Sequence, residues 1–268
     1  MAGGPTSPGR TRLTTWNVFH GRSLDDGRVD AGRLAAAVAS LGTDVLALQE
    51  VDRGQDRSAG LDVTAVAAEA MGATHWRFVP TVIGSPGFSW RAATAEDADA
   101  RSDAYGVALL SRFPVDSWHV LRLPPAPFVR LPVPVPGAGV ALWLRDEPRV
   151  VLAGRVRTPA GPLTVASTHL SFVPGMNVVQ LRRAVAWLRT LPGPTVLLGD
   201  LNLPPAVAGR ASGLDVLARA VSYPAQRPRL QLDHALGDGR LPRVRRSWVC
   251  RAAVSDHLAL GVDLDNRE

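Results

Sequence analysis

Apolar residues along the chain fall into short runs, most of them strand-sized, which Gly, Pro and polar residues separate. Continuous or alternating apolar runs of this length predict β-strands. The predicted strands cover residues 12–19, 44–48, 74–82, 105–110, 149–157, 163–168, 195–199, 230–236, 244–249 and 258–262.

Other segments repeat apolar residues at helical spacing. Asp30 is a suitable N-cap for a helix that reaches Leu41, with its apolar residues on one face. Further helices are predicted over residues 61–71 and after Pro174, a residue that suits a first helical turn. Many strands with a few helices predict an α/β chain in which two packed sheets carry helices outside.

Two long connections interrupt this pattern. Residues 83–103 are rich in Gly, Ser and acidic residues, and residues 121–139 are rich in proline. Connections of this length are uncommon in compact domains unless they have a function. The first is a candidate lid or binding loop, and the second is predicted to be a stiff, packed or substrate-facing loop.

The chain is predicted to hold one domain over residues 12–268, after a disordered lead-in at residues 1–11. The lead-in has no apolar core, so it does not resemble a secretory signal. No run of about eighteen apolar residues predicts a transmembrane segment. The lone Cys250 excludes an internal disulfide, and we expect a cytoplasmic monomer.

The formal net charge is +6, and all 30 basic residues are arginine. A positive surface suits polyanionic partners such as nucleic acid or anionic lipid. Arginine without lysine, in a chain rich in Ala, Gly and Pro, is equally typical of a codon bias. Charge alone therefore does not choose a partner.

Polar residues recur where the predicted strands end, and strand ends form the rims of sheets, where functional groups from distant positions converge. Carboxylate and amide oxygens are ligands for Mg²⁺ or Mn²⁺, and histidines transfer protons. Taken singly, each residue is more often a solvated acid, a turn residue or a core histidine. The set comprises Asn17, Glu50, His169, Asp200, Asn202, Asp233, Asp256 and His257.

Seven motifs that occur in order favour a functional site over these structural interpretations. They are TTWNV (14–18), LQEVD (48–52), YGVALLSRFP (105–114), STHLS (167–171), GDLN (199–202), QLDH (231–234) and SDHLAL (255–260). From about Leu13 to Val262 the chain resembles the endonuclease/exonuclease/phosphatase superfamily, which contains deoxyribonuclease I, neutral sphingomyelinases and inositol polyphosphate 5-phosphatases. The resemblance implies a deoxyribonuclease I-like four-layer α/β/β/α sandwich, in which helices flank two mixed sheets and the site lies at one rim.

The resemblance also implies a metal centre. Glu50 would be the principal ligand of Mg²⁺, with Mn²⁺ as an alternative, and Asn17 and Asp256 would lie beside it. Such an ion polarises a phosphoryl oxygen and offsets the charge that builds up in the transition state.

The remaining motif residues would act on water and phosphate. By resemblance, Asp200 orients or deprotonates the attacking water, and Asn202 donates a hydrogen bond to the phosphate. His257 would be the general acid/base, held in its tautomer by Asp233. His169 would be a second donor to the phosphate.

Asp103 lies where deoxyribonuclease-like and sphingomyelinase-like relatives carry an acid that pairs with the first histidine. The resemblance therefore implies an Asp103–His169 pair, although Asp103 is also one of several acids in its loop. Tyr105 and Arg155 are the other candidate substrate contacts. Arg157 is an alternative to Arg155, because any arginine fork matches phosphate oxygens.

The chain is thus predicted to be a metal-dependent phosphodiesterase or phosphomonoesterase, acting on nucleic acid or on a phospholipid or inositol phosphate. His169 argues against the abasic-site endonucleases, which lack histidine in that segment. A Trp-x-Asp-Arg signature typical of the 5-phosphatases is not visible. The alternative is a non-catalytic nucleic-acid- or partner-binding module on the same fold, but such a module is expected to have lost at least one of these site residues.

Overall fold

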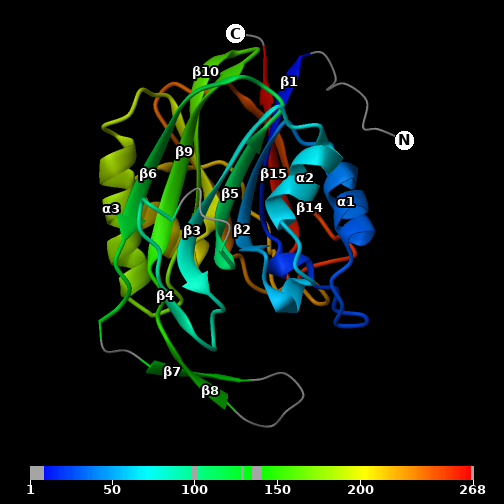
Figure 1. Cartoon of the computed structure of the whole chain (residues 1–268). Coiled ribbons are helices and arrows are strands. Elements are labelled where there is room, and N and C mark those ends of the chain that lie inside the picture. The colour runs from blue at the N-terminus through cyan, green and yellow to red at the C-terminus, as the bar shows by residue number, and fades with distance from the viewer. Residues whose placement is uncertain (1–8, 98–101, 128–129, 135–140, 267–268) are drawn as a thin grey trace.

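The structure, a computed structural model, describes residues 9–97, 102–127, 130–134 and 141–266. Two sheets pack face to face, and helices cover their outer faces (Figure 1). The predicted α/β/β/α sandwich of two mixed sheets is confirmed.

The larger sheet has seven strands in the order β14-β15-β1-β2-β5-β3-β4. β1 and β2 run parallel, and the other neighbours run antiparallel. In sheet order, the strands cover Val244–Cys250, Ala259–Asp265, Arg10–Asn17, Val45–Arg53, Ala104–Ser111, His75–Gly84 and Trp90–Ala92.

The smaller sheet has six strands in the order β12-β13-β11-β10-β9-β6, of which β10 and β11 run parallel. In sheet order, these strands cover Asp215–Val216, Asp233–Asp238, Thr195–Asp200, Gly161–His169, Arg149–Thr158 and Val115–Leu123. A separate two-stranded sheet, β7 (Arg130–Pro134) and β8 (Ala141–Arg145), lies beyond the lower end of the sandwich in Figure 1.

Helices α1 (Ala31–Ser40) and α2 (Val63–Met71) cover the larger sheet, while α3 (Met176–Leu188) and α4 (Pro205–Ser212) cover the smaller one. Short 3₁₀ turns occupy Phe19–Gly21 and Asp56–Ser58. The predicted N-cap of α1 is confirmed, since the Asp30 carboxylate accepts a hydrogen bond from the Arg33 backbone N–H at 2.7 Å. No helix in these described ranges has the length and apolarity that a membrane crossing requires.

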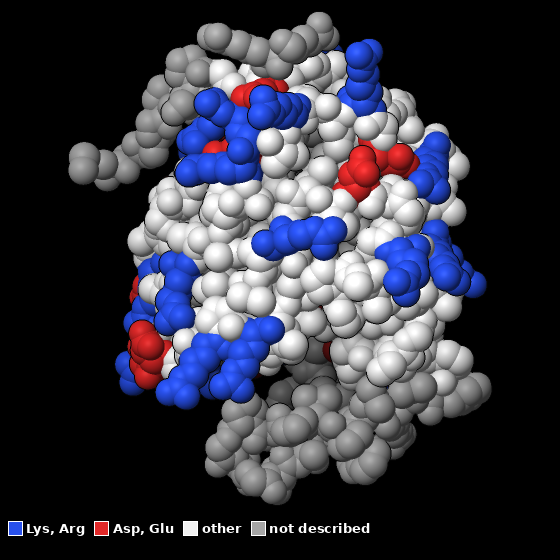
Figure 2. Space-filling model, turned by 180° about the vertical axis from the view of Figure 1, so that it is seen from behind, with Lys and Arg blue, Asp and Glu red and all other residues white. Residues whose placement is uncertain are grey.

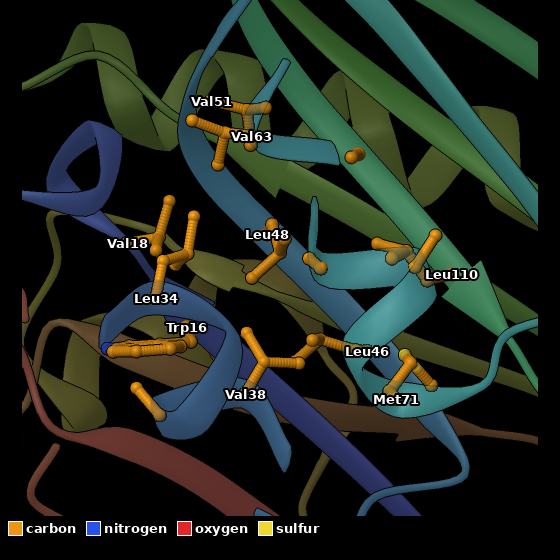
Figure 3. Packing of buried hydrophobic residues seen from close by; sticks show 14 of the residues in the cluster. Trp16, Val18, Leu34, Val38, Leu46, Leu48, Val51, Val63, Met71 and Leu110 are labelled. Carbon is orange, nitrogen blue, oxygen red and sulfur yellow. The ribbon is translucent and has the colours of Figure 1, made fainter. Parts of the chain in front are cut away.

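Three apolar clusters correspond to the three interfaces between the four layers. Figure 3 shows the interface between α1, α2 and the larger sheet, where Trp16 and Leu46 from the strands meet Val38 and Met71 from the helices. Fully burying one large apolar side chain stabilises the fold by about 1.5–3 kcal/mol. The sandwich is therefore held by side chains on the inward faces of every layer, and its strand ends are left for other uses.

Several predicted boundaries were wrong, because pairing with a neighbouring strand, rather than the apolar run alone, decides where a strand begins and ends. β1 begins at Arg10, so the last two residues of the predicted lead-in are strand, and residues 1–8 lie outside the described residues. β13 begins only at Asp233. The two long connections contain β4, part of β6 and β7, while residues 98–101, 128–129 and 135–140 lie outside the described residues.

Candidate active site

Strand pairing brings the predicted site residues to one rim of the sandwich. His169 pairs with Asp200 at the ends of β10 and β11, and Asp200 pairs with Asp233 across β11 and β13. From the larger sheet, the Asn17 side-chain N–H donates to Asp200 Oδ2 at 3.1 Å. The two sheets therefore contribute to one site, at the lower end of the strands in Figure 1 and away from both labelled chain ends.

Three residues of this rim have left-handed backbone conformations although none is glycine. The φ angles are 54° at Glu50, 50° at Asn202 and 77° at Ser255. Glu50 lies in a bulge of β2, between Leu48 and Val51, rather than at the end of the strand as predicted. Such conformations cost about 1–3 kcal/mol each and persist where the surroundings enforce them, which is common at functional sites.

His257 is held from several sides. Its Nδ1 lies 2.8 Å from Asp233 Oδ2, its backbone N–H donates to Ser255 Oγ at 2.9 Å, and its carbonyl accepts from Trp16 Nε1 at 3.1 Å. Burial favours the neutral ring, but the carboxylates of Asp233 and Asp200 outweigh burial and raise the pKa of His257 to about 10. The ring is therefore protonated at neutral pH and presents Nε2–H to the site.

Asp200 lies between the two histidines. Its Oδ2 is 3.6 Å from His169 Nε2 and 3.7 Å from His257 Nε2, and its Oδ1 accepts the Asn202 backbone N–H at 3.0 Å. Asn202 Nδ2 lies 3.3 Å from His169 Nε2. Burial raises the pKa of Asp200 to about 6 and lowers the pKa of His169 well below its usual value. The site thus combines a carboxylate that can accept a proton with a neutral imidazole.

Glu50 and Asp256 form an acidic edge beside this cluster. Burial raises the pKa of both carboxyl groups, and the charge of Glu50 helps to raise the pKa of Asp256 to about 6. Carboxylates whose charge is disfavoured by burial and by neighbouring acids are suited to a hard cation. Asn17 fits less simply, because its Nδ2 donates to Glu50 Oε1 at 3.0 Å while its Oδ1 accepts the Phe19 N–H at 3.2 Å. Asn17 would have to turn its amide to offer oxygen to a metal.

Within the described ranges, Asp200, Asp233 and His257 form a group whose ligand atoms lie within 4.8 Å of one another, close enough to hold a metal ion. Metal binding requires a neutral imidazole. His257 holds its proton and bonds Asp233, so this group is better suited to proton transfer. Glu50 and Asp256 remain the better candidates for binding a cation.

The predicted Asp103–His169 pair was wrong. Asp103 is exposed, its carboxylate lies against Gly54, and its carbonyl accepts the Gly84 N–H at 2.8 Å. His169 is buried and forms no ion pair with Asp103 within the part of the chain that the structure describes. Tyr105, two residues later in β5, is buried instead, and burial and then the charge of Glu50 raise its pKa.

The arginine prediction was also wrong. The Arg155 guanidinium donates to the Pro192 carbonyl at 2.9 Å and lines a cavity of about 560 Å³ near the start of β10, whereas His169 ends that strand. Arg157 lies in an exposed ion pair with Asp116 at 2.6 Å. Strand pairing places both residues at the end of β9 away from the site.

Sequence reasoning missed three residues that the structure places at the rim. Ser255 Oγ donates to the Asn17 carbonyl at 2.5 Å and lies inside the SDHLAL motif, so that motif contained its signal. The Tyr223 ring packs 4.7 Å from the His257 ring, between centroids, and follows no predicted strand. Arg149 lies at the start of β9 and affects the pKa of His169.

Solved structures of other proteins share this fold. Among solved structures, an endonuclease/exonuclease/phosphatase protein from Beutenbergia cavernae has 24% identity and a TM-score of 0.64, covering 96% of this chain and 72% of that chain. Sphingomyelinase C from Streptomyces griseocarneus has 17% identity and a TM-score of 0.59, covering 96% and 100%. Humanized D. rerio TDP2 has 14% identity and a TM-score of 0.60, covering 95% and 98%.

A comparison with curated protein sequences gave no significant match. The family model described as the endonuclease/exonuclease/phosphatase family matches residues 14–257, which include the rim residues from Asn17 to His257. The likeness to solved structures supports the fold, and the family match covers most of the chain. The chain belongs to the endonuclease/exonuclease/phosphatase family.

Proposed function

We propose that the protein is a divalent-metal-dependent hydrolase that cleaves a phosphate ester with water. Members of its family are generally phosphoester hydrolases, and most of them depend on a divalent metal. The observation that carries the proposal is the position of Asp200, between the imidazoles of His169 and His257 and bonded to Asn17 of the other sheet. A carboxylate that can take a proton from water and side chains that can donate hydrogen bonds to a phosphate thus lie within one small site.

In the proposed mechanism, Asp200 orients the attacking water and accepts its proton. A pKa of about 6 leaves this carboxylate mostly ionised at pH 7 but still basic enough to take a proton. His257, held by Asp233, donates Nε2–H to the phosphoryl group or the leaving oxygen. In the tautomer with the proton on Nε2, neutral His169 would donate to a second phosphoryl oxygen together with Asn202 Nδ2, which lies 3.3 Å from it, rather than accept from Asn202.

Glu50 and Asp256 would hold the cation, with Asn17 beside them. The ion would be Mg²⁺ or Mn²⁺, because the donors offered are hard oxygens. When bound, it would polarise a phosphoryl oxygen and offset negative charge in the transition state. Without the ion, the negative charge of Glu50 disfavours the ionised form of Asp256. A bound cation would remove this unfavourable interaction.

The substrate is proposed to be a nucleic acid or a phospholipid or inositol phosphate. Figure 2 shows arginine side chains on the back face in several separate groups, with uncharged surface between them. A continuous basic track of the kind that follows a nucleic-acid backbone is not visible on that face. Neither this face nor the net charge of +6 therefore chooses between these substrate classes.

A phosphoester panel tests this function. Plasmid DNA, RNA, sphingomyelin, inositol phosphates and bis-p-nitrophenyl phosphate would each be incubated with Mg²⁺, Mn²⁺ or Ca²⁺. We expect EDTA-sensitive hydrolysis of at least one substrate, and loss of that hydrolysis in Asp200→Asn. Hydrolysis of none of them, by a protein that nevertheless binds nucleic acid or lipid tightly, would support the non-catalytic binding module instead.

Metal binding is expected to depend on pH with a midpoint near 6. Asp256 has a pKa of about 6 without a cation, and its carboxyl group must lose a proton before it can bind one. The Mg²⁺ affinity should therefore fall as the pH drops from 8 to 5, with more protons released per bound ion at pH 5.5 than at pH 8. Calorimetry in two buffers of different ionisation enthalpy measures this release. An affinity that is constant across this range would contradict the assignment of Asp256 as a ligand.

A further inference from the structure

Arg149 enters the rim from the strand next to His169. It is the first residue of β9, and β9 pairs antiparallel with β10, so that Val151 lies opposite Thr168. Residue 149 therefore lies at the same end of the smaller sheet as His169, the last residue of β10. None of the roles assigned above uses this arginine.

The guanidinium of Arg149 is buried with few partners. Its side chain is only 3% exposed, and its sole ion pair within the described ranges joins Nη2 to Asp146 Oδ1 at 3.4 Å. Its Nε has no hydrogen-bond partner. A guanidinium carries five N–H donors, and burying a charge is costly unless it is paired and hydrogen-bonded. Most N–H groups of Arg149 thus form no hydrogen bond to a described residue, although, against burial, the charge of Glu147 helps to raise the pKa of the guanidinium.

Two other partly buried arginines, Arg12 and Arg57, use more of their donors and form shorter bonds. Arg12, whose side chain is 11% exposed, bonds Asp263 through Nε at 2.8 Å and Nη2 at 3.1 Å, and the Leu41 carbonyl through Nη1 at 3.0 Å. The Arg57 guanidinium donates two hydrogen bonds to the Asp52 carboxylate, at 2.8 and 2.7 Å. Arg149 is more deeply buried than either but has one long bond.

The charge of Arg149 acts on the phosphate side of the site. After burial, it is the largest influence that lowers the pKa of His169. It also opposes the rise in the pKa of Tyr105, which burial, Glu50 and Glu147 produce. The register of β9 and β10 places Arg149 at the strand end where His169 and Asn202 would meet a phosphoryl oxygen.

We propose that Arg149 is a substrate-binding residue, which donates its unused N–H groups to a nonbridging oxygen of the substrate phosphate beside His169. The proposal rests on the phosphoesterase function proposed above. The planar fork of arginine matches two phosphate oxygens, and a lysine ammonium does not reproduce it. Asp146 positions the fork from behind, since its carboxylate also accepts the Ala126 N–H at 2.6 Å and is thereby fixed.

The test measures phosphate binding separately from turnover. Inorganic phosphate is titrated into the Mg²⁺-containing protein by calorimetry, and kcat and KM are measured with whichever phosphoester the wild type hydrolyses. Arg149→Met should weaken phosphate binding by about 10–100-fold, because hydrogen bonds to charged groups contribute about 1.5–3 kcal/mol. Arg149→Lys keeps the charge beside Asp146, so it should retain the wild-type Tm and raise KM about tenfold.

Arg12→Met is the matched control, because it removes another arginine ion pair far from the rim. It should lower Tm and leave phosphate affinity and KM unchanged. If Arg149→Met does not fold, the Arg149→Lys variant decides. Wild-type KM and phosphate affinity in a folded Arg149 variant, with active wild-type enzyme, would overturn the proposal for Arg149 alone. A wild type without any EDTA-sensitive hydrolysis would instead overturn the proposed function.

Discussion

Replacing His257 by alanine is expected to lower kcat for phosphoester hydrolysis by about 10²–10⁴-fold, the range that a positioned proton donor contributes. Asp233 holds Nδ1 of this ring at 2.8 Å and keeps it protonated, with a pKa of about 10. Alanine removes the donor that faces Asp200 and the phosphate. Because the proton rather than binding is lost, KM should change much less than kcat. Steady-state kinetics at saturating Mg²⁺ measures the effect.

Asp233→Asn extends the same test. The amide keeps the shape of the carboxyl group but removes the charge that most raises the pKa of His257, so the ring should lose its proton at a lower pH. The high-pH limb of the rate profile should therefore move to lower pH. His75→Ala is the control, because His75 begins β3 at the end of the sheet away from the site. If His257→Ala retained wild-type kcat, His257 would not be the proton donor.

Replacing Glu50 by glutamine is expected to abolish metal-dependent turnover, with a fall of about a thousandfold or more, since a bound cation supplies several kcal/mol of transition-state stabilisation. Glutamine keeps the size of the side chain but removes a charge that the acidic edge needs. Burial and the charge of Asp200 raise the pKa of Glu50, so this charge is costly without a cation. The Tm of the metal-free variant should consequently equal or exceed that of the wild type.

Loss of turnover together with an unchanged or higher Tm in the absence of metal distinguishes a metal ligand from a structural carboxylate. Mg²⁺ should raise the Tm of the wild type and leave the Tm of Glu50→Gln unchanged, because only binding to the folded state stabilises it. Glu69→Gln, on the exposed face of α2, is the matched control and should respond to Mg²⁺ as the wild type does. Equal Mg²⁺-induced shifts in Glu50→Gln and wild type would remove Glu50 from the metal site.

Local pattern predicted much of this fold. The apolar runs near residues 44–48, 105–110 and 195–199 all became buried strands, because a strand covered on both faces needs a continuous apolar sequence. The N-cap at Asp30 was also readable, because capping involves only residues three positions apart. The order of the seven motifs then indicated the family and the residues of the rim.

The sequence by itself thus determined most of the buried strands and the polar motifs that lie near them. Only the tertiary structure decided which of those residues meet, because that depends on strand pairing and on the bends between strands. Asp103 and Arg155 have side chains that would suit the site. However, Asp103 is exposed, and Arg155 lies at the end of its strand away from the site. Arg149 was not among the site residues predicted from the sequence. The role proposed for it depends on its burial at the same strand end as His169, with donors left unpaired. Burial and pairing are properties of the packed chain, so no local pattern encodes them.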